Sequence, residues 1–155
     1  MNKIFIKPKS NFPYMDTNIP FEKSLADIKV LLRKFKCDEI LTHEAGDLIK
    51  IAFKKEGIPY IIDFPLIYVE GKKTPARLEM GISGRVVYNR LKSNLLDVEI
   101  GSLSFMQAML RSIALPSPQG LVTMGEVVEA QKDGIIKGQI SFDPGKIKLL
   151  TKGDG

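Results

Sequence analysis

The stretch Ile49-Lys-Ile-Ala-Phe-Lys-Lys-Glu-Gly-Ile-Pro-Tyr-Ile-Ile-Asp-Phe64 decides the fold. Apolar residues recur at every second position before and after the segment Lys55-Glu56-Gly57. Such alternation is typical of a strand with one buried face, and a short glycine-containing segment between two alternating runs is typical of a hairpin loop. The stretch therefore predicts two antiparallel strands whose buried faces hold Ile49, Ile51, Phe53, Tyr60, Ile62 and Phe64.

A third strand and a helix are predicted on the amino-terminal side. Residues 39–43 form a candidate strand, joined to the next strand by a turn at residues 45–47. Ser24, followed three residues later by Asp27, has the spacing of a capping box, and the helix it opens should end near Lys36. A helix on one face of a three-strand meander would bury its apolar stripe, which consists of Leu25, Ile28, Leu32 and Phe35.

A helical hairpin is predicted after the meander. Thr74 and Pro75 are suited to begin a helix that runs to about Val98 and is followed by Gly101. Gly81 and Gly84 weaken its first half, and close helix packing or a local bend explains them better than a phosphate-binding loop. Ser104 with Gln107 forms a second capping box, which opens the other helix of the hairpin, with Phe105, Met109 and Ile113 on one face.

The remaining segments flank this core. Residues 3–7 alternate and predict either a short strand or part of a loose arm. Residues 115–120 predict a stiff loop, and Thr123 with Glu126 forms a third capping box, opening a short helix that Gly134 closes. Residues 139–150 predict a small hairpin around Asp143-Pro144-Gly145.

Together these elements predict an α+β fold. A small antiparallel sheet is packed by an amino-terminal helix and followed by a helical hairpin, a short carboxy-terminal helix and a β-hairpin. Residues 1–18 form an arm, residues 19–134 the core domain and residues 135–155 an appendage with a frayed end.

Composition places the protein in a broad class. The chain has 155 residues, enough for one domain with its own core, and its single cysteine, Cys37, excludes an internal disulfide. The apolar run at the start is too short for a signal peptide, and no stretch approaches the ~20 apolar residues of a membrane span. We therefore expect a cytoplasmic protein, in the host cytoplasm if its origin is viral. The net charge of +5 favours a polyanionic partner.

The strongest functional candidate is a group of basic residues. On the predicted long helix, Arg77, Arg85 and Lys92 share a sector of about a quarter turn, whereas Arg90 lies away from it. Such a sector could follow a phosphate backbone, although a solvated helix face paired with Glu79 or Asp97 would give the same pattern. The nucleic-acid-binding candidates are Lys72, Lys73, Arg77, Arg85 and Lys92.

Other candidate sites have ordinary structural explanations. His43-Glu44 with Asp47 could form an acid–base or metal site, but zinc spacing is absent and a turn explains the pattern. Cys37 could be a nucleophile only if its pKa were depressed, and a half-buried structural cysteine is the simpler interpretation. The tyrosines are attributed to the core or its rim rather than to a base-stacking platform. We therefore expect no metal and no cofactor.

A set of short landmarks follows one another along residues 21–126. They are Ser24-Leu-Ala-Asp-Ile-Lys-Val-Leu-Leu32, Ile51-Ala-Phe53, Asp63-Phe-Pro-Leu66, Arg90-Leu-Lys92, Asp97-Val-Glu99, Ser104-Phe-Met-Gln-Ala-Met-Leu110, Ile113-Ala-Leu-Pro116 and Met124-Gly-Glu126. In this order the set resembles a family of small bacteriophage and prophage proteins of unknown function. The resemblance covers about two-thirds of the chain, with a longer loop at residues 116–122, and it implies a viral or mobile-element origin without implying an activity.

Three hypotheses for the function follow. The first is a non-enzymatic accessory protein that binds nucleic acid or a nucleic-acid-processing complex. The second is a protein-interaction module, either an inhibitor of host defence or a homo-oligomeric assembly factor, which exposed Phe105, Met106 and Met109 would support. The third is an enzyme with a degenerate site around His43.

Overall fold

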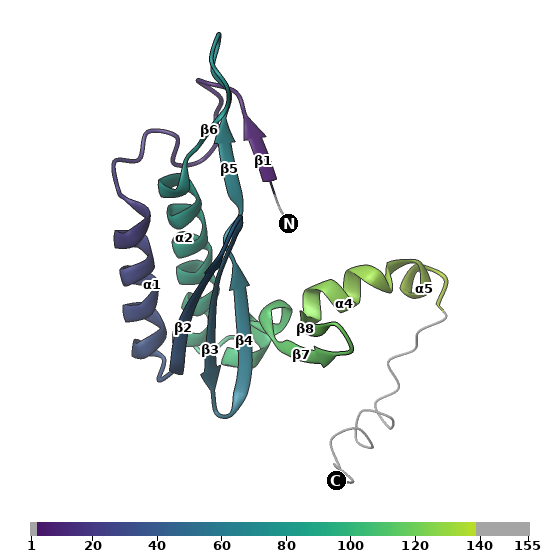
Figure 1. Ribbon diagram of the computed structural model, residues 1–155. Helices are drawn as coiled ribbons and strands as arrows, with labels where there is room; N and C mark the ends of the chain where they lie inside the picture. Colours follow the sequence, from purple (N-terminus) through teal and green to yellow (C-terminus); the bar gives the residue numbers. More distant parts are fainter. Residues whose placement is uncertain (1–2, 139–155) are drawn as a thin grey trace, which may run out of the picture.

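The structure is a computed structural model and describes residues 3–138 (Figure 1). Helices and small sheets are intermixed, which confirms the predicted α+β class. In chain order the elements are β1 (Lys3–Ile6), α1 (Phe21–Lys34), β2 (Asp38–Ala45), β3 (Leu48–Lys55), β4 (Ile58–Asp63), β5 (Leu66–Val69), β6 (Arg77–Leu78), α2 (Met80–Glu99), α3 (Phe105–Ala108), the 3-10 helix η1 (Leu110–Ser112), β7 (Ala114–Ser117), β8 (Gly120–Thr123), α4 (Met124–Ala130) and α5 (Lys132–Ile136).

The predicted meander is confirmed. Strands β2, β3 and β4 pair antiparallel in that order. Lys55 pairs with Ile58, so the second connection is a two-residue turn. Its residues Glu56 and Gly57 have φ of +53° and +78°, the positive values that a type I′ turn requires and that match the twist of the flanking strands.

One face of the meander is covered by the two long helices, α1 and α2 (Figure 1). Aromatic rings fill the centre: Phe53 stacks on Tyr60 with 5.3 Å between ring centroids, and Phe105 meets Tyr60 edge-on at 5.5 Å. Aliphatic residues from both helices and the strands complete this core, among them Ile28, Leu32, Ile51, Ile62, Val87, Leu91 and Leu95.

Helices α1 and α2 lie side by side and run parallel. Arg85 near the start of α2 donates to Ser24 near the start of α1, while Lys34 pairs with Glu99 at the other end. A Cβ added at Gly84 would lie only 2.7 Å from the Ser24 Cβ. This glycine therefore permits close helix packing, which confirms one of the two explanations predicted for it.

The predicted cap at Ser24 is wrong. Helix α1 begins at Phe21 after Pro20, with no side-chain cap, and Ser24 is fully buried. The spacing of Ser24 and Asp27 resembled a capping box because both residues face α2, where each accepts a hydrogen bond from Arg85.

A second, smaller sheet was not predicted. Pro65 separates β4 from the next strand, but the chain resumes at once as β5, which pairs in parallel with β1 and antiparallel with β6. The predicted amino-terminal arm thus contributes a strand. Ile6 and Ile67 pack against Ile82 of α2 in a core cluster of their own.

The helical hairpin is shorter than predicted. Helix α2 begins at Met80 rather than at Thr74 or Pro75, because residues 77–78 form β6. The capping box of Ser104 with Gln107 is confirmed, but α3 has only four residues. The second arm of the expected hairpin therefore continues as η1 and β7.

The carboxy-terminal part agrees with the predictions in some respects. Residues 114–123 form the β7–β8 hairpin where a stiff loop was expected, and the capping box of Thr123 with Glu126 is confirmed. Gly134 does not close the last helix, since it lies inside α5. The predicted hairpin at residues 139–150 falls outside the described residues.

Candidate nucleic-acid interface

Basic residues from three segments lie at one end of the sheet formed by β1, β5 and β6, which we call the small sheet. Because β1 and β5 are parallel, the segments that follow them leave the sheet on the same side. The backbone N–H of Glu70 donates to the carbonyl of Ile6 at 2.9 Å, which ties the two exits together. Both exits lie at the top of Figure 1, beside β6. We call the basic residues at this end the basic cluster: Lys7, Lys9, Lys72, Lys73 and Arg77.

All five residues of the basic cluster are exposed to solvent. Arg77 donates through Nε to Glu79 at 2.7 Å and keeps 83% of its side chain exposed. Within residues 3–138, no carboxylate lies within 4.0 Å of the ammonium groups of the four lysines. Among the described residues, therefore, only Arg77 of the cluster is paired with a carboxylate, and the lysines present positive charge that this part of the chain does not pair.

The predicted helical sector does not exist as a surface. Arg77 lies in β6 rather than on the helix, so the angular argument that joined it to Arg85 is wrong. Arg85 is buried, and Lys92 is exposed about two turns further along α2. The structure thus brings Lys72, Lys73 and Arg77 together and separates Arg85 and Lys92 from them.

Two members of the cluster were missed from the sequence. Lys7 and Lys9 follow β1, and the other three follow or belong to β5 and β6, more than sixty positions further on. Alternation at residues 3–7 could have suggested a strand end. Only the pairing of β1 with β5 shows which loop that end adjoins.

Arg85 has a structural environment. Its Nε donates to Ser24 Oγ at 2.9 Å and its Nη2 donates to Asp27 Oδ2 at 3.2 Å. Its guanidinium carbon lies 4.4 Å from the centroid of the Tyr88 ring. Hydrogen bonds from Lys23 and Arg85 and their positive charges lower the pKa of Asp27, despite partial desolvation. Arg85 therefore links α2 to α1 through hydrogen bonds to two side chains of α1.

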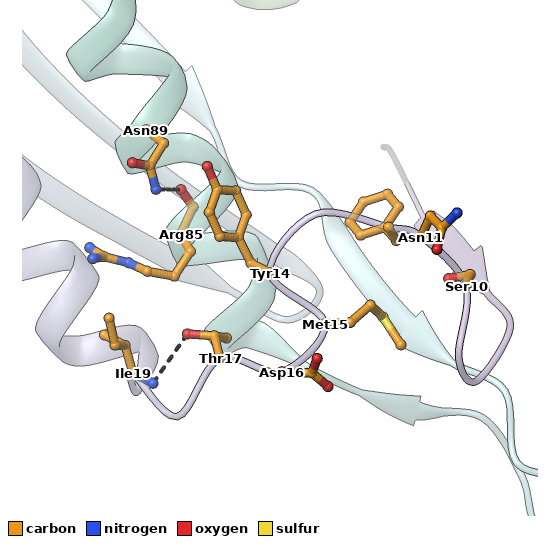
Figure 2. A pocket seen from close by; sticks show the side chains of 10 residues that line it. Ser10, Asn11, Tyr14, Met15, Asp16, Thr17, Ile19, Arg85 and Asn89 are labelled. Carbon is orange, nitrogen blue, oxygen red and sulfur yellow. Dashed lines mark hydrogen bonds between the residues drawn. The ribbon is translucent and has the colours of Figure 1, made fainter.

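A cavity of about 640 Å³ lies between residues 10–19 and α2 (Figure 2). Asn89 lines it and donates to the carbonyl of Arg85 at 2.8 Å. Tyr14 on its rim has φ of +64°, a conformation that costs non-glycine residues energy. Ser10 Oγ is shielded from solvent and has no hydrogen-bond partner among the described residues. The lining contains hydroxyl, amide and guanidinium groups and the carboxylate of Asp16, and none of its ten residues is a histidine or cysteine.

The His43 segment is divided between a strand and a turn. His43 and Glu44 lie in β2, while Asp47 belongs to the turn and pairs with Lys3 at 2.9 Å. Over residues 3–138, no group of three or more His, Cys, Asp or Glu residues is placed to hold a metal ion. The turn explanation accounts for Asp47, and the metal-site hypothesis has no geometry to support it.

Cys37 follows α1 and is buried, with 7% of its surface exposed. Burial raises the pKa of its thiol to about 11, against the smaller opposing effect of the Lys55 charge. Because the thiolate is the nucleophilic form, a thiol with this pKa is almost entirely protonated near neutral pH. The structural interpretation of Cys37 therefore fits its surroundings.

None of the helices described between residues 3 and 138 is both long and apolar enough to cross a bilayer. Comparisons with protein-family models, with curated proteins and with solved structures found no match to this chain.

Proposed function

We propose that this protein is a non-catalytic accessory protein of a phage or mobile element that binds nucleic acid through the basic cluster. The observation that carries the proposal is the convergence of five exposed cations from three chain segments at one end of the small sheet. The origin rests on the family resemblance.

The chemistry of the basic cluster favours phosphate contacts. Lysine and arginine side chains that neutralise phosphates release condensed counterions, and this release dominates non-specific affinity. Four lysines act as flexible point charges, which suits a repeating backbone better than one fixed anion. Phosphate contacts position a protein on nucleic acid without reading the base sequence, so we expect this surface to bind nucleic acids irrespective of their sequence.

The test replaces four lysines of the basic cluster by glutamine, which removes charge but keeps most of the aliphatic stem. The quadruple variant is Lys7→Gln, Lys9→Gln, Lys72→Gln and Lys73→Gln. Between 50 and 200 mM salt, the parent should lose roughly 100-fold more affinity than the variant, since each phosphate contact contributes about 0.9 to the slope of log K against log salt for B-DNA. Fluorescence anisotropy with a labelled 20-nucleotide oligomer and its duplex measures both slopes.

A charge-matched control separates the basic cluster from net charge. Lys29→Gln, Arg33→Gln, Lys132→Gln and Lys137→Gln remove four cations from α1 and from α5 and its carboxy-terminal end. This control should change the slope little. Two results would exclude the basic cluster as the binding surface. One is an equal salt slope for the parent and the quadruple variant, and the other is an equal decrease of that slope in the control.

A second candidate function, protein interaction through self-association, is favoured by an apolar surface. Phe105 and Met109 belong to the core and cannot supply it, but Met106 is 47% exposed. Four further exposed apolar residues lie within residues 96–110, and exposed apolar surface concentrated in one segment favours an interface. They are Leu96, Ile100, Leu103 and Leu110.

If this surface joins two copies, sedimentation velocity should show a concentration-dependent dimer. Ile100→Glu should abolish that dimer, because a carboxylate cannot be desolvated there without a partner. Val30→Glu on α1, where Val30 is 64% exposed, is the matched control. A parent that stays monomeric at high micromolar concentration would exclude self-association.

A further inference from the structure

A row of three side chains, two of them aromatic, crosses the small sheet next to the basic cluster. Phe5 of β1 is in register with Tyr68 of β5, which is in register with Leu78 of β6. The Phe5 and Tyr68 rings are stacked, with 5.1 Å between centroids and 16° between planes. Phe5 is 58% exposed and Leu78 is 41% exposed. Phe5 is therefore the most exposed residue of this row, and its stacking partner Tyr68 is only partly exposed.

This row lies on the face of the sheet opposite the core. Residues alternate between the two faces of a strand, so Ile4 and Ile6 point away from Phe5. Ile6, together with Ile67 and Ile82, is buried in the cluster beneath the sheet. Apart from its stack with Tyr68, Phe5 belongs to neither hydrophobic core cluster of the described residues.

Cations flank the row on the same face. By the same alternation, Lys3 and Lys7 share the side of Phe5. The pKa of Lys3 is raised mainly by its hydrogen bond to Asp47 and by the charge of that carboxylate, with a smaller contribution from Tyr68. Lys3 is thus occupied by Asp47. Lys7 belongs to the basic cluster, which continues beyond the same end of the sheet.

We propose that the Phe5–Tyr68 pair stacks on unpaired bases of a single-stranded nucleic acid whose backbone follows the basic cluster. This inference rests on the proposed function and narrows it to single strands. In a duplex, the base faces are already stacked on each other, so they are not accessible to an exposed aromatic ring. In a single strand, stacking on an aromatic side chain contributes to binding irrespective of base identity, and cations nearby hold the backbone.

A stacking reporter tests the geometry directly, because the chain has no tryptophan. Phe5→Trp introduces one indole at the proposed platform, and Val30→Trp introduces one on α1 as the control. Titration with 20-nucleotide oligothymidylate, oligouridylate and a DNA duplex should quench the emission of the Phe5→Trp variant only with the single strands. An unquenched Phe5→Trp variant that still binds single strands would overturn the stacking platform.

Affinity gives an independent readout. Phe5→Leu keeps an apolar side chain but removes the ring, and should weaken single-strand binding about tenfold while leaving duplex binding unchanged. Because the variant loses the stack with Tyr68, its melting temperature should fall by a few degrees, and it should remain folded. Val30→Ala on α1, where Val30 is 64% exposed, is the control and should bind like the parent. Equal affinities of parent and Phe5→Leu, with a salt slope that still depends on the basic cluster, would overturn the platform and leave the proposed function standing. A parent that binds none of the three probes would overturn both.

Discussion

Arg85→Ala is expected to lower the free energy of unfolding by about 3 kcal/mol. Ser24 is fully buried, and its hydroxyl would lose the guanidinium that it accepts from, which costs about 1–3 kcal/mol. The substitution also removes the arginine stem and its contact with the Tyr88 ring, adding lost packing. Urea denaturation at pH 7 measures the change.

Arg77→Ala is the matched control for Arg85→Ala. Its side chain is 83% exposed and its ion pair with Glu79 lies at the surface, so the expected loss of stability is below about 0.5 kcal/mol. Folded Arg85→Ala should bind nucleic acid like the parent. If Arg85→Ala instead lost less than about 1 kcal/mol of stability and bound nucleic acid more weakly than the parent, Arg85 would be a nucleic-acid contact, as the sequence suggested.

The sequence predicted those parts of the fold that local patterns determine. Alternation over residues 49–64 and the glycine of the Glu56-Gly57 turn specify the meander, because period and turn conformation are properties of neighbouring residues. The capping boxes at Ser104 and Thr123 are local for the same reason. Ser24 has similar spacing, yet its hydroxyl bonds to Arg85, sixty-one positions away. Local spacing cannot distinguish a cap from a contact between helices.

The candidate interface depends on pairing that no local pattern contains. No strand was predicted between Phe64 and Thr74, so β5 was missed, and with it the parallel partner of β1. Without that pair, no local pattern relates Lys7 to Lys72, and Tyr68 was assigned to the core or its rim. The prediction of a basic sector on the helix was wrong because it placed Arg77 in the helix, whereas Arg77 lies in the extended strand β6. The charged residues are visible in the sequence, but their arrangement depends on the long-range topology.

Phe105→Ala is expected to cost about 4 kcal/mol of stability, because removing a buried phenylalanine leaves a cavity. The Phe105 ring is 8% exposed and meets Tyr60 edge-on, and the Lys55 ammonium lies 5.6 Å from its centroid. Helix α3 is a single turn, so this ring, rather than helical propensity, holds it to the sheet. Phe105→Leu should cost less, because leucine refills part of the cavity, and the neighbouring exposed Met106→Ala should cost below about 0.5 kcal/mol. Urea denaturation of the three variants orders them; a Phe105→Ala loss no larger than that of Met106→Ala would show that α3 is held to the sheet by other contacts.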